Sequence, residues 1–213
     1  MNKYTERFTR VKMAMAGVVP LDTNVQIIHL DANGNRKAIF QDNELCISLI
    51  KAGKLPANWI NQWYAPYISW ALGHWSDTKH NRNLVPTAGK AGVASRINGA
   101  GAEALFDKIG WGTGVVAPGA GDTTLGTEVT ASGSAASGVH VVSAATASRV
   151  TTTVTNDTAQ LVGTVTATGT IAITESGVFN AATNGTLLAR QTFTVINVVS
   201  GDSIQFTWKI AAA

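Results

Sequence analysis

The sequence holds few residues whose types and spacing could bind a metal ion. Asp31, Asn33 and Asn35 occupy alternate positions, as ligands do in a calcium-binding loop. That loop also needs glycine at its sixth position and glutamate at its twelfth, and here those positions hold arginine and aspartate. The Asn-Gly dipeptide at 33–34 lies between two apolar runs, which is the strongest local signal for a β-hairpin. Residues 25–40 are therefore predicted to form a hairpin and not a calcium site.

The candidates for nucleophilic, metal and phosphate chemistry lack partners at functional spacing. Cys46 lies among apolar residues of a predicted helix, without the His and acidic residue that would activate it. His74 and His80 stand six apart with no cysteine or second acidic partner at ligand spacing. The glycine-rich stretches at 88–92 and 98–101 lack the residue order of a phosphate-binding loop. We expect no catalytic residue, no cofactor and no metal ion.

Two pairs of opposite charges fall within predicted strands. Glu175 and Arg190 lie in adjacent runs joined by a turn at 180–185, so we expect them to pair across the sheet. Glu128 and Arg149 are a second candidate pair. Since no third group completes a catalytic constellation, both pairs are predicted to fix register or to orient a loop.

The composition excludes several classes of protein. Charged residues make up 14% of the 213 residues, and the net charge of +3 is too small and scattered to indicate nucleic-acid binding. The one cysteine excludes an internal disulfide. No run of about 20 apolar residues is present that could span a membrane. The first residues lack the apolar core of a signal peptide, so we expect a protein made in a cytoplasm.

The elements that would position these residues are mainly strands. Four runs near the C-terminus, at 160–168, 170–180, 186–196 and 202–210, alternate apolar or β-branched residues with small polar ones. A period of two between turn residues is typical of half-buried antiparallel strands. Further runs at 106–111, 138–142 and 147–154 bring the strands to seven or eight. The sequence predicts a mainly β protein with a C-terminal antiparallel β-sandwich of jelly-roll or Greek-key type, in which the last four strands form a meander.

The N-terminal half is predicted to be a smaller α+β region. Residues 1–20 carry apolar residues at spacings of three and four, which fits either a short helix or an arm that orders against a partner. A capped helix is expected at 42–53. The predicted organisation is an arm at 1–20, an α+β region at 21–88, a linker at 89–104 and the sandwich at 105–213.

An aromatic segment at 55–76 has three possible explanations. Two prolines divide it into short pieces. Its aromatic side chains could form the core of the N-terminal region, an anchor on a neighbouring subunit, or a stacking platform for sugar rings. As candidate interface residues we select Trp59, Trp63, Tyr64, Tyr67 and Trp70.

Six stretches between residues 105 and 210 form a recognisable pattern: IGWGTG at 109–114, DTTLGTE at 122–128, SRVT at 148–151, ITESGVFN at 173–180, LLAR at 187–190 and GDSIQFTW at 201–208. Through these stretches, residues 105–210 resemble a β-rich module common in structural proteins of tailed bacteriophages. The resemblance implies a non-enzymatic virion subunit without catalytic residues. The leading hypothesis is a capsid cement (decoration) protein on the capsid surface, whose partners are the major capsid protein and copies of itself, possibly as a trimer.

This hypothesis has two alternatives. A tail, baseplate or fibre component would use exposed aromatic side chains to bind a host glycan or receptor. A glycan hydrolase would need two carboxylates about 5–10 Å apart in a cleft, and the acidic residues here are few and dispersed.

Overall fold

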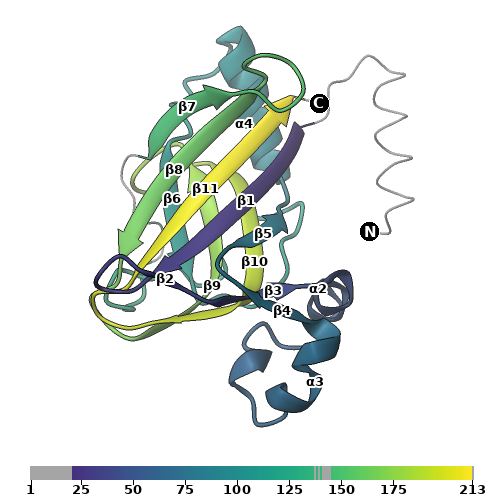
Figure 1. Cartoon of the computed structure of the whole chain (residues 1–213). Coiled ribbons are helices and arrows are strands. Elements are labelled where there is room, and N and C mark those ends of the chain that lie inside the picture. Colours follow the sequence, from purple (N-terminus) through teal and green to yellow (C-terminus); the bar gives the residue numbers. More distant parts are fainter. Residues whose placement is uncertain (1–20, 137, 139, 141–144, 213) are drawn as a thin grey trace.

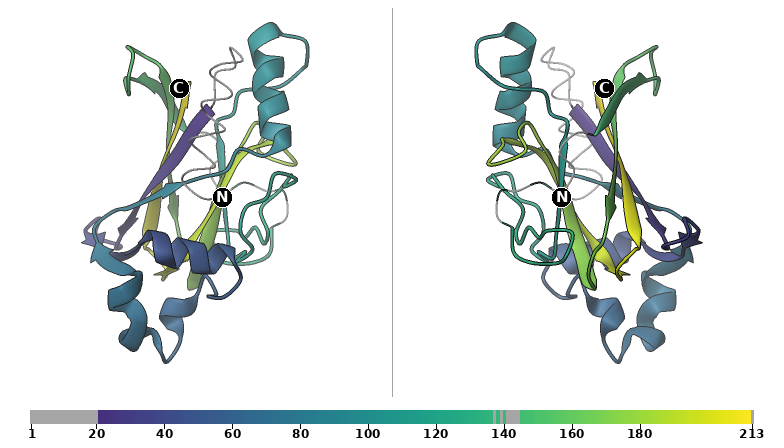
Figure 2. Two further views of the ribbon diagram at one scale, coloured as in Figure 1. Left: turned by 90° about the vertical axis from the view of Figure 1, so that its right-hand side faces the viewer. Right: turned by 90° about the vertical axis from the view of Figure 1, so that its left-hand side faces the viewer.

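The part of the chain that the structure describes folds into two antiparallel sheets that face each other, a small third sheet of two strands, β3 (Ile39–Asp42) and β4 (Gly73–Ser76), and three α-helices at the margins (Figures 1 and 2). The computed structural model describes residues 21–136, 138, 140 and 145–212. Strands account for 42% of the described residues and helices for 17%. The predicted mainly β, sandwich-like fold is therefore confirmed.

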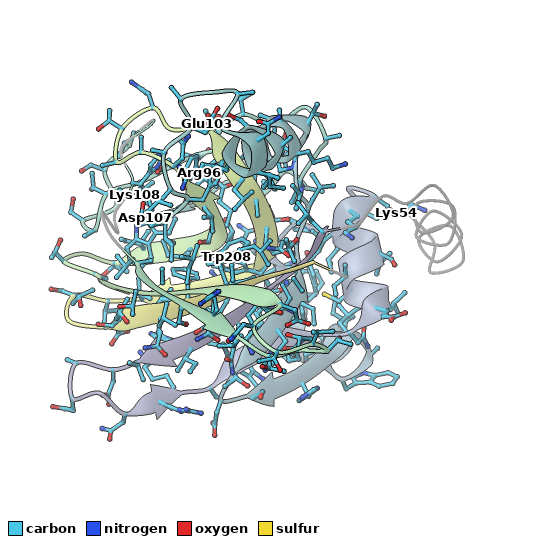
Figure 3. All side chains as sticks on the ribbon, turned by 90° about the horizontal axis from the view of Figure 1, so that it is seen from above. Lys54, Arg96, Glu103, Asp107, Lys108 and Trp208 are labelled. Atoms are coloured by element: carbon cyan, nitrogen blue, oxygen red, sulfur yellow. The ribbon has the colours of Figure 1, made fainter. Side chains whose placement is uncertain are left out.

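The first sheet has the strand order β2-β1-β11-β8-β7, and β5 also pairs with β1. Its strands are β1 (Leu21–Leu30), β2 (Arg36–Lys37), β5 (Lys79–Arg82), β7 (Thr146–Val150), β8 (Thr158–Thr166) and β11 (Ser203–Ala212). On β11, Ile204, Phe206 and Trp208 are buried and the residues between them are half-buried, as the period-two pattern requires. Seen from above, Trp208 lies in the interior of the molecule (Figure 3).

The second sheet has the order β10-β9-β6, and its two longer strands are buried on both faces. Its strands are β6 (Lys108–Gly112), β9 (Ile171–Phe179) and β10 (Leu187–Val198). One face packs on the first sheet. The other face is covered by the loop at 113–128 and by the helix α4 (Thr87–Asn98), which explains why β9 and β10 bury polar as well as apolar residues.

A smaller unit, which we call the aromatic module, comprises residues 39–76. It contains β3 (Ile39–Asp42), α2 (Glu44–Lys51), the short 3₁₀ helix η1 (Trp59–Asn61), α3 (Ala65–Leu72) and β4 (Gly73–Ser76). As predicted, the helix α2 begins after a capping residue: the Asn43 side chain accepts a hydrogen bond from the Cys46 backbone N–H at 2.9 Å. The module has its own core around Phe40, Trp59 and Leu72, and it lies at the lower end of the molecule in Figure 1.

The predicted domain boundaries are wrong in two places. The strand β1 pairs with β11 along its whole length, from Leu21 opposite Ala212 to Leu30 opposite Ser203, so the N-terminal half supplies a central strand of the sandwich. The predicted linker at 89–104 is largely occupied by α4, which ends at Gly99 in the left-handed conformation. The predicted arm at 1–20 and most of the predicted strand at 138–142 lie outside the described residues.

The last four strands do not form the predicted meander. β8 pairs with β7 and β11 in the first sheet, whereas β9 and β10 pair with each other in the second. The chain therefore crosses between the sheets after β8 and again after β10. Within the described ranges, no helix is long and apolar enough to cross a bilayer.

Candidate functional site

The most unusual surface feature is a set of exposed aromatic side chains on the aromatic module. Trp63 and Trp70 are each 82% exposed, and Tyr67 and Trp75 are also largely exposed. We call these four residues the aromatic cluster. Tyr67 and Trp70 stand three residues apart on α3, and the indole N–H of Trp70 donates to the Tyr67 carbonyl at 2.9 Å, so they share one side of the helix.

Part of the aromatic cluster borders a groove of about 400 Å³. Trp63 and Trp75 line it together with Ile60, Gln62 and Ser69. Trp75 is held edge-on against the buried Phe40 ring, with ring centroids 5.7 Å apart, so its outward position is fixed from behind. The groove therefore combines large aromatic surfaces with amide and hydroxyl groups.

The structure separates the predicted interface residues into two groups. Trp63, Tyr67 and Trp70 are available at the surface. Trp59, in contrast, is fully buried and donates its indole N–H to the Thr194 hydroxyl at 3.1 Å, so its assignment to an interface is wrong. Tyr64 is half-buried, packs on the core of the module and meets Trp63 edge-on at 5.8 Å.

The aromatic module is attached to the sandwich through an irregularity in β10. The register between β9 and β10 shifts between Thr192 and Ile196, which leaves the intervening residues unpaired with β9. There the Val195 N–H donates to the Ala57 carbonyl at 3.0 Å. Asn61 and Asn197 exchange side-chain hydrogen bonds nearby, at 3.1 and 2.8 Å. The bulge thus gives β10 the free backbone groups that dock the module.

A second attachment is a buried ionic group formed by Asp42 and Lys79. The Lys79 side chain is 0% exposed, and its Nζ donates to Asp42 Oδ2 at 2.5 Å and to the Phe40 carbonyl at 2.6 Å. The Thr194 hydroxyl donates to Asp42 Oδ1. Burial lowers the pKa of Lys79 below its ordinary value, although the Asp42 charge opposes this shift. This group joins the module to both sheets.

The predicted pair of Glu175 and Arg190 is present and is the centre of a larger network. Arg190 donates to Glu175 Oε2 from Nε at 2.9 Å and from Nη2 at 2.8 Å. Arg190 Nη1 also donates to Asp122 Oδ2 at 2.6 Å. The Glu175 carboxylate accepts three backbone N–H groups of the 113–128 loop, from Gly114, Gly126 and Thr127. The network therefore holds this loop against the second sheet, as the prediction of a loop-orienting role requires.

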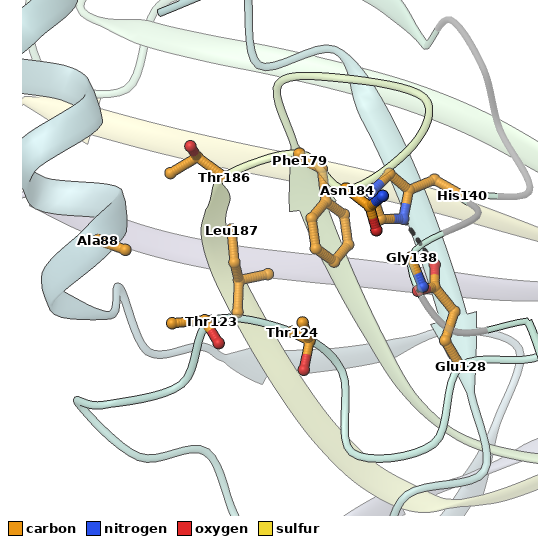
Figure 4. A pocket seen from close by; sticks show the side chains of 11 residues that line it. Ala88, Thr123, Thr124, Glu128, Gly138, His140, Phe179, Asn184, Thr186 and Leu187 are labelled. Atoms are coloured by element: carbon orange, nitrogen blue, oxygen red, sulfur yellow. Dashed lines mark hydrogen bonds and ion pairs between the residues drawn. The ribbon is translucent and has the colours of Figure 1, made fainter.

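The second predicted pair is wrong. Arg149 is exposed on β7, while Glu128 is buried and accepts a hydrogen bond from His140 Nδ1 at 2.6 Å (Figure 4). His140 stacks on Phe179 with ring centroids 3.6 Å apart. The pair lines a pocket of about 330 Å³ together with Thr124, Leu187 and Phe179. No local sequence pattern indicates this pair, because its partners lie 12 residues apart and outside regular helices and strands.

Asp31 and Cys46 have structural roles. The Asp31 carboxylate accepts the backbone N–H groups of Asn33 and Asn35, as expected for a turn. Cys46 is buried, and burial with the nearby Asp42 charge raises its pKa to about 12. His74 and His80 are exposed. Over the parts of the chain that the structure describes, no three His, Cys, Asp or Glu residues are grouped so that they could hold a metal ion.

A further buried group lies where β1 meets the loop before β11. His29 Nε2 donates to Asp202 Oδ2 at 3.0 Å, and Lys37 Nζ donates to the same oxygen at 2.9 Å. Burial lowers the pKa of His29, against the opposing effect of the Asp202 hydrogen bond. This group holds the hairpin formed by β1 and β2 against the loop that precedes β11, near the C-terminus.

Comparison of the chain with protein-family models, with curated proteins and with solved structures finds no match.

Proposed function

We propose that this protein is a non-enzymatic structural subunit of a tailed-bacteriophage particle, and specifically a cement protein on the capsid surface. Its partners would be the major capsid protein and further copies of itself. The observation that carries the proposal is the aromatic cluster, which exposes Trp63, Tyr67, Trp70 and Trp75 on a module fixed to a β-sandwich.

The size of the aromatic cluster favours a protein-binding surface. A tryptophan or tyrosine side chain buries about 150–250 Å² when it is fully covered. Four such side chains, more than half exposed, offer more apolar surface than the few hundred Å² that soluble monomers ordinarily leave uncovered. Tryptophan and tyrosine also dominate the energy of protein interfaces. Leaving this surface in water is costly unless a partner covers it.

The attachment of the module suits a protein that transmits load between neighbours. Trp59, Asp42 and Lys79 connect the module to the bulge in β10 and to β5 by buried contacts. A force applied at the aromatic cluster would therefore pass into both sheets. Many copies, each with one such contact, would reinforce a shell through multivalency. A symmetric oligomer, most simply a trimer at a threefold position, matches the symmetry of such shells.

Electron microscopy of particles with and without the protein tests the proposal. We expect regularly spaced density on the shell that disappears when the protein is absent, together with earlier rupture of the depleted particles on heating. Density at the tail tip with none on the shell would refute the cement function.

The groove beside Trp63 and Trp75 supports a second candidate function, a tail, baseplate or fibre component that binds a host glycan. Aromatic faces stack on sugar rings, and the Gln62 amide and Ser69 hydroxyl could bind sugar hydroxyl groups. Binding of the isolated protein to a glycan array, lost in Trp63→Ala but kept in Ile97→Ala on α4, would favour this candidate over cement. Absence of any glycan signal would exclude it for the sugars on the array.

A further inference from the structure

The buried group around Asp42 and Lys79 holds an amine and a carboxyl group in contact, and these two groups can react with each other. Asp42 is the last residue of β3 and Lys79 is the first residue of β5, so the pair spans the chain segment that carries the aromatic module. Both side chains are essentially inaccessible, at 1% and 0% exposure. Among the described residues, the Asp42 carboxylate is the one acidic group that contacts the Lys79 amine.

The contacts differentiate the two oxygens of the Asp42 carboxyl group. Oδ1 accepts from the Thr194 hydroxyl and from the Cys46 thiol, the latter at 3.4 Å. Because the Trp59 indole N–H occupies the Thr194 oxygen at 3.1 Å, the Thr194 hydroxyl hydrogen is directed at Oδ1. Oδ2 lies 2.5 Å from Lys79 Nζ and 3.3 Å from the Thr194 backbone N–H. One oxygen is thus polarised as a carbonyl, and the other faces the amine.

We propose that Asp42 and Lys79 join in an intramolecular isopeptide bond. The neutral Lys79 amine attacks Cγ of the protonated Asp42 carboxyl group and forms a C–N bond. Negative charge develops on Oδ1, where the Thr194 hydroxyl and the Cys46 thiol stabilise it. The amine gives a proton to Oδ2, the Cγ–Oδ2 bond breaks, and that oxygen leaves as water with the carboxyl proton. The amine and the acid lose one water molecule in total, and no oxidant, reductant or other reactant is required.

The environment favours the neutral reactants. In a dry site, an ammonium and a carboxylate each carry a large desolvation penalty, which proton transfer from amine to carboxylate removes. Burial lowers the pKa of Lys79, which acts in this direction. The reacting groups are also held in contact by the fold, so the reaction needs no encounter step. Phe40 supplies the backbone carbonyl that holds Nζ in place.

The bond would close a covalent loop around the aromatic module. The 36 residues between its ends, 43–78, contain the whole aromatic cluster. A covalent link from β3 to β5 would keep this module attached to the sandwich when the surrounding hydrogen bonds are broken. The inference does not depend on the particle or partner to which the cluster binds.

Intact-mass spectrometry of the denatured full-length protein tests the inference directly. We expect a mass lower than that of the sequence by one water molecule, and a branched peptide that links the segments around residues 42 and 79 after proteolysis. The matched control is Lys79→Arg, which keeps the positive charge but cannot form this amide. Its mass should equal that of its own sequence, after any terminal processing shared with the wild type.

A second variant tests the role assigned to Thr194. Thr194→Val removes the hydroxyl that stabilises charge on Oδ1, and newly purified protein should contain an unlinked fraction that the wild type lacks. The proposed isopeptide bond would be refuted if folded wild-type protein, after ageing, still had the full mass of its sequence. A wild type and a Thr194→Val variant linked at the same rate would overturn the role of Thr194.

Discussion

The buried network around Arg190 gives the strongest prediction about stability. Replacing Arg190 by methionine keeps much of the side-chain volume but leaves the Glu175 carboxylate without its cation. Glu175 is fully buried, and its carboxylate would be left with the three backbone N–H groups of the 113–128 loop as partners. Removing one partner of a buried ion pair costs about 3–5 kcal/mol, far above the ~0–1 kcal/mol of surface pairs. The added contact with Asp122 is partly exposed and contributes less.

We therefore expect Arg190→Met to lower the free energy of unfolding by about 4 kcal/mol. For a chain of this length, that loss corresponds to a fall in Tm of roughly 8–16 °C. Urea unfolding followed by tryptophan fluorescence measures the free energy, and calorimetry measures Tm. The matched control is Arg149→Met on the exposed strand β7, which should stay within about 0.5 kcal/mol of the wild type.

A double-mutant cycle tests the coupling itself. Glu175→Gln combined with Arg190→Met should cost clearly less than the sum of the two single changes, because each single change leaves an unpaired buried partner. If Arg190→Met costs under about 1 kcal/mol, or if the two changes are additive, the network does not hold the loop as described.

Three further predictions concern other buried groups. Because the pKa of His29 is lowered in the folded protein, the unfolded chain takes up the proton on this side chain first as pH falls below the ordinary pKa of 6.5. The free energy of unfolding should therefore decrease below that pH. His29→Gln should remove this part of the pH dependence, measured by urea titrations at several pH values. Cys46, buried and with a pKa raised to about 12, should not react with a thiol reagent until the protein unfolds, and fast labelling of the native protein would contradict its placement. A methyl group at Gly89 would lie 2.3 Å from a carbonyl oxygen of β10, so Gly89→Ala should lower the unfolding free energy by about 1–3 kcal/mol, whereas Gly121→Ala, which meets no atom within 4 Å, should change it little.

The strands could be predicted from sequence because their pattern is local. In β11 the buried residues Ile204, Phe206 and Trp208 alternate with half-buried ones. This pattern can be recognised without knowing which strand β11 pairs with. The pairing of Glu175 with Arg190 followed from the same reasoning, since a turn joins the two strands. The three backbone N–H groups that complete this network come from a loop about 50–60 residues earlier, which no local pattern indicates.

The errors arose where distant parts of the chain determine the structure. β1 pairs with β11 although nearly the whole sequence separates them. The linker prediction at 89–104 is wrong because Gly89 and Gly92, which lower helix propensity, here allow α4 to pack closely on β10 and on Phe106. Trp59 and Trp63 look alike in sequence, and only the docking of the module on the β10 bulge buries the first and exposes the second.

The proposed function requires that the aromatic cluster binds the capsid shell. Co-sedimentation of the purified protein with shells that lack it measures this binding. Because interface hot spots contribute about 2 kcal/mol or more each, Trp63→Ala combined with Trp70→Ala should weaken binding roughly 1,000-fold. Ile97→Ala, which is equally exposed but lies on α4 at the opposite end of the molecule, should bind like the wild type (Figure 1). Undiminished binding by the folded double variant would contradict the account.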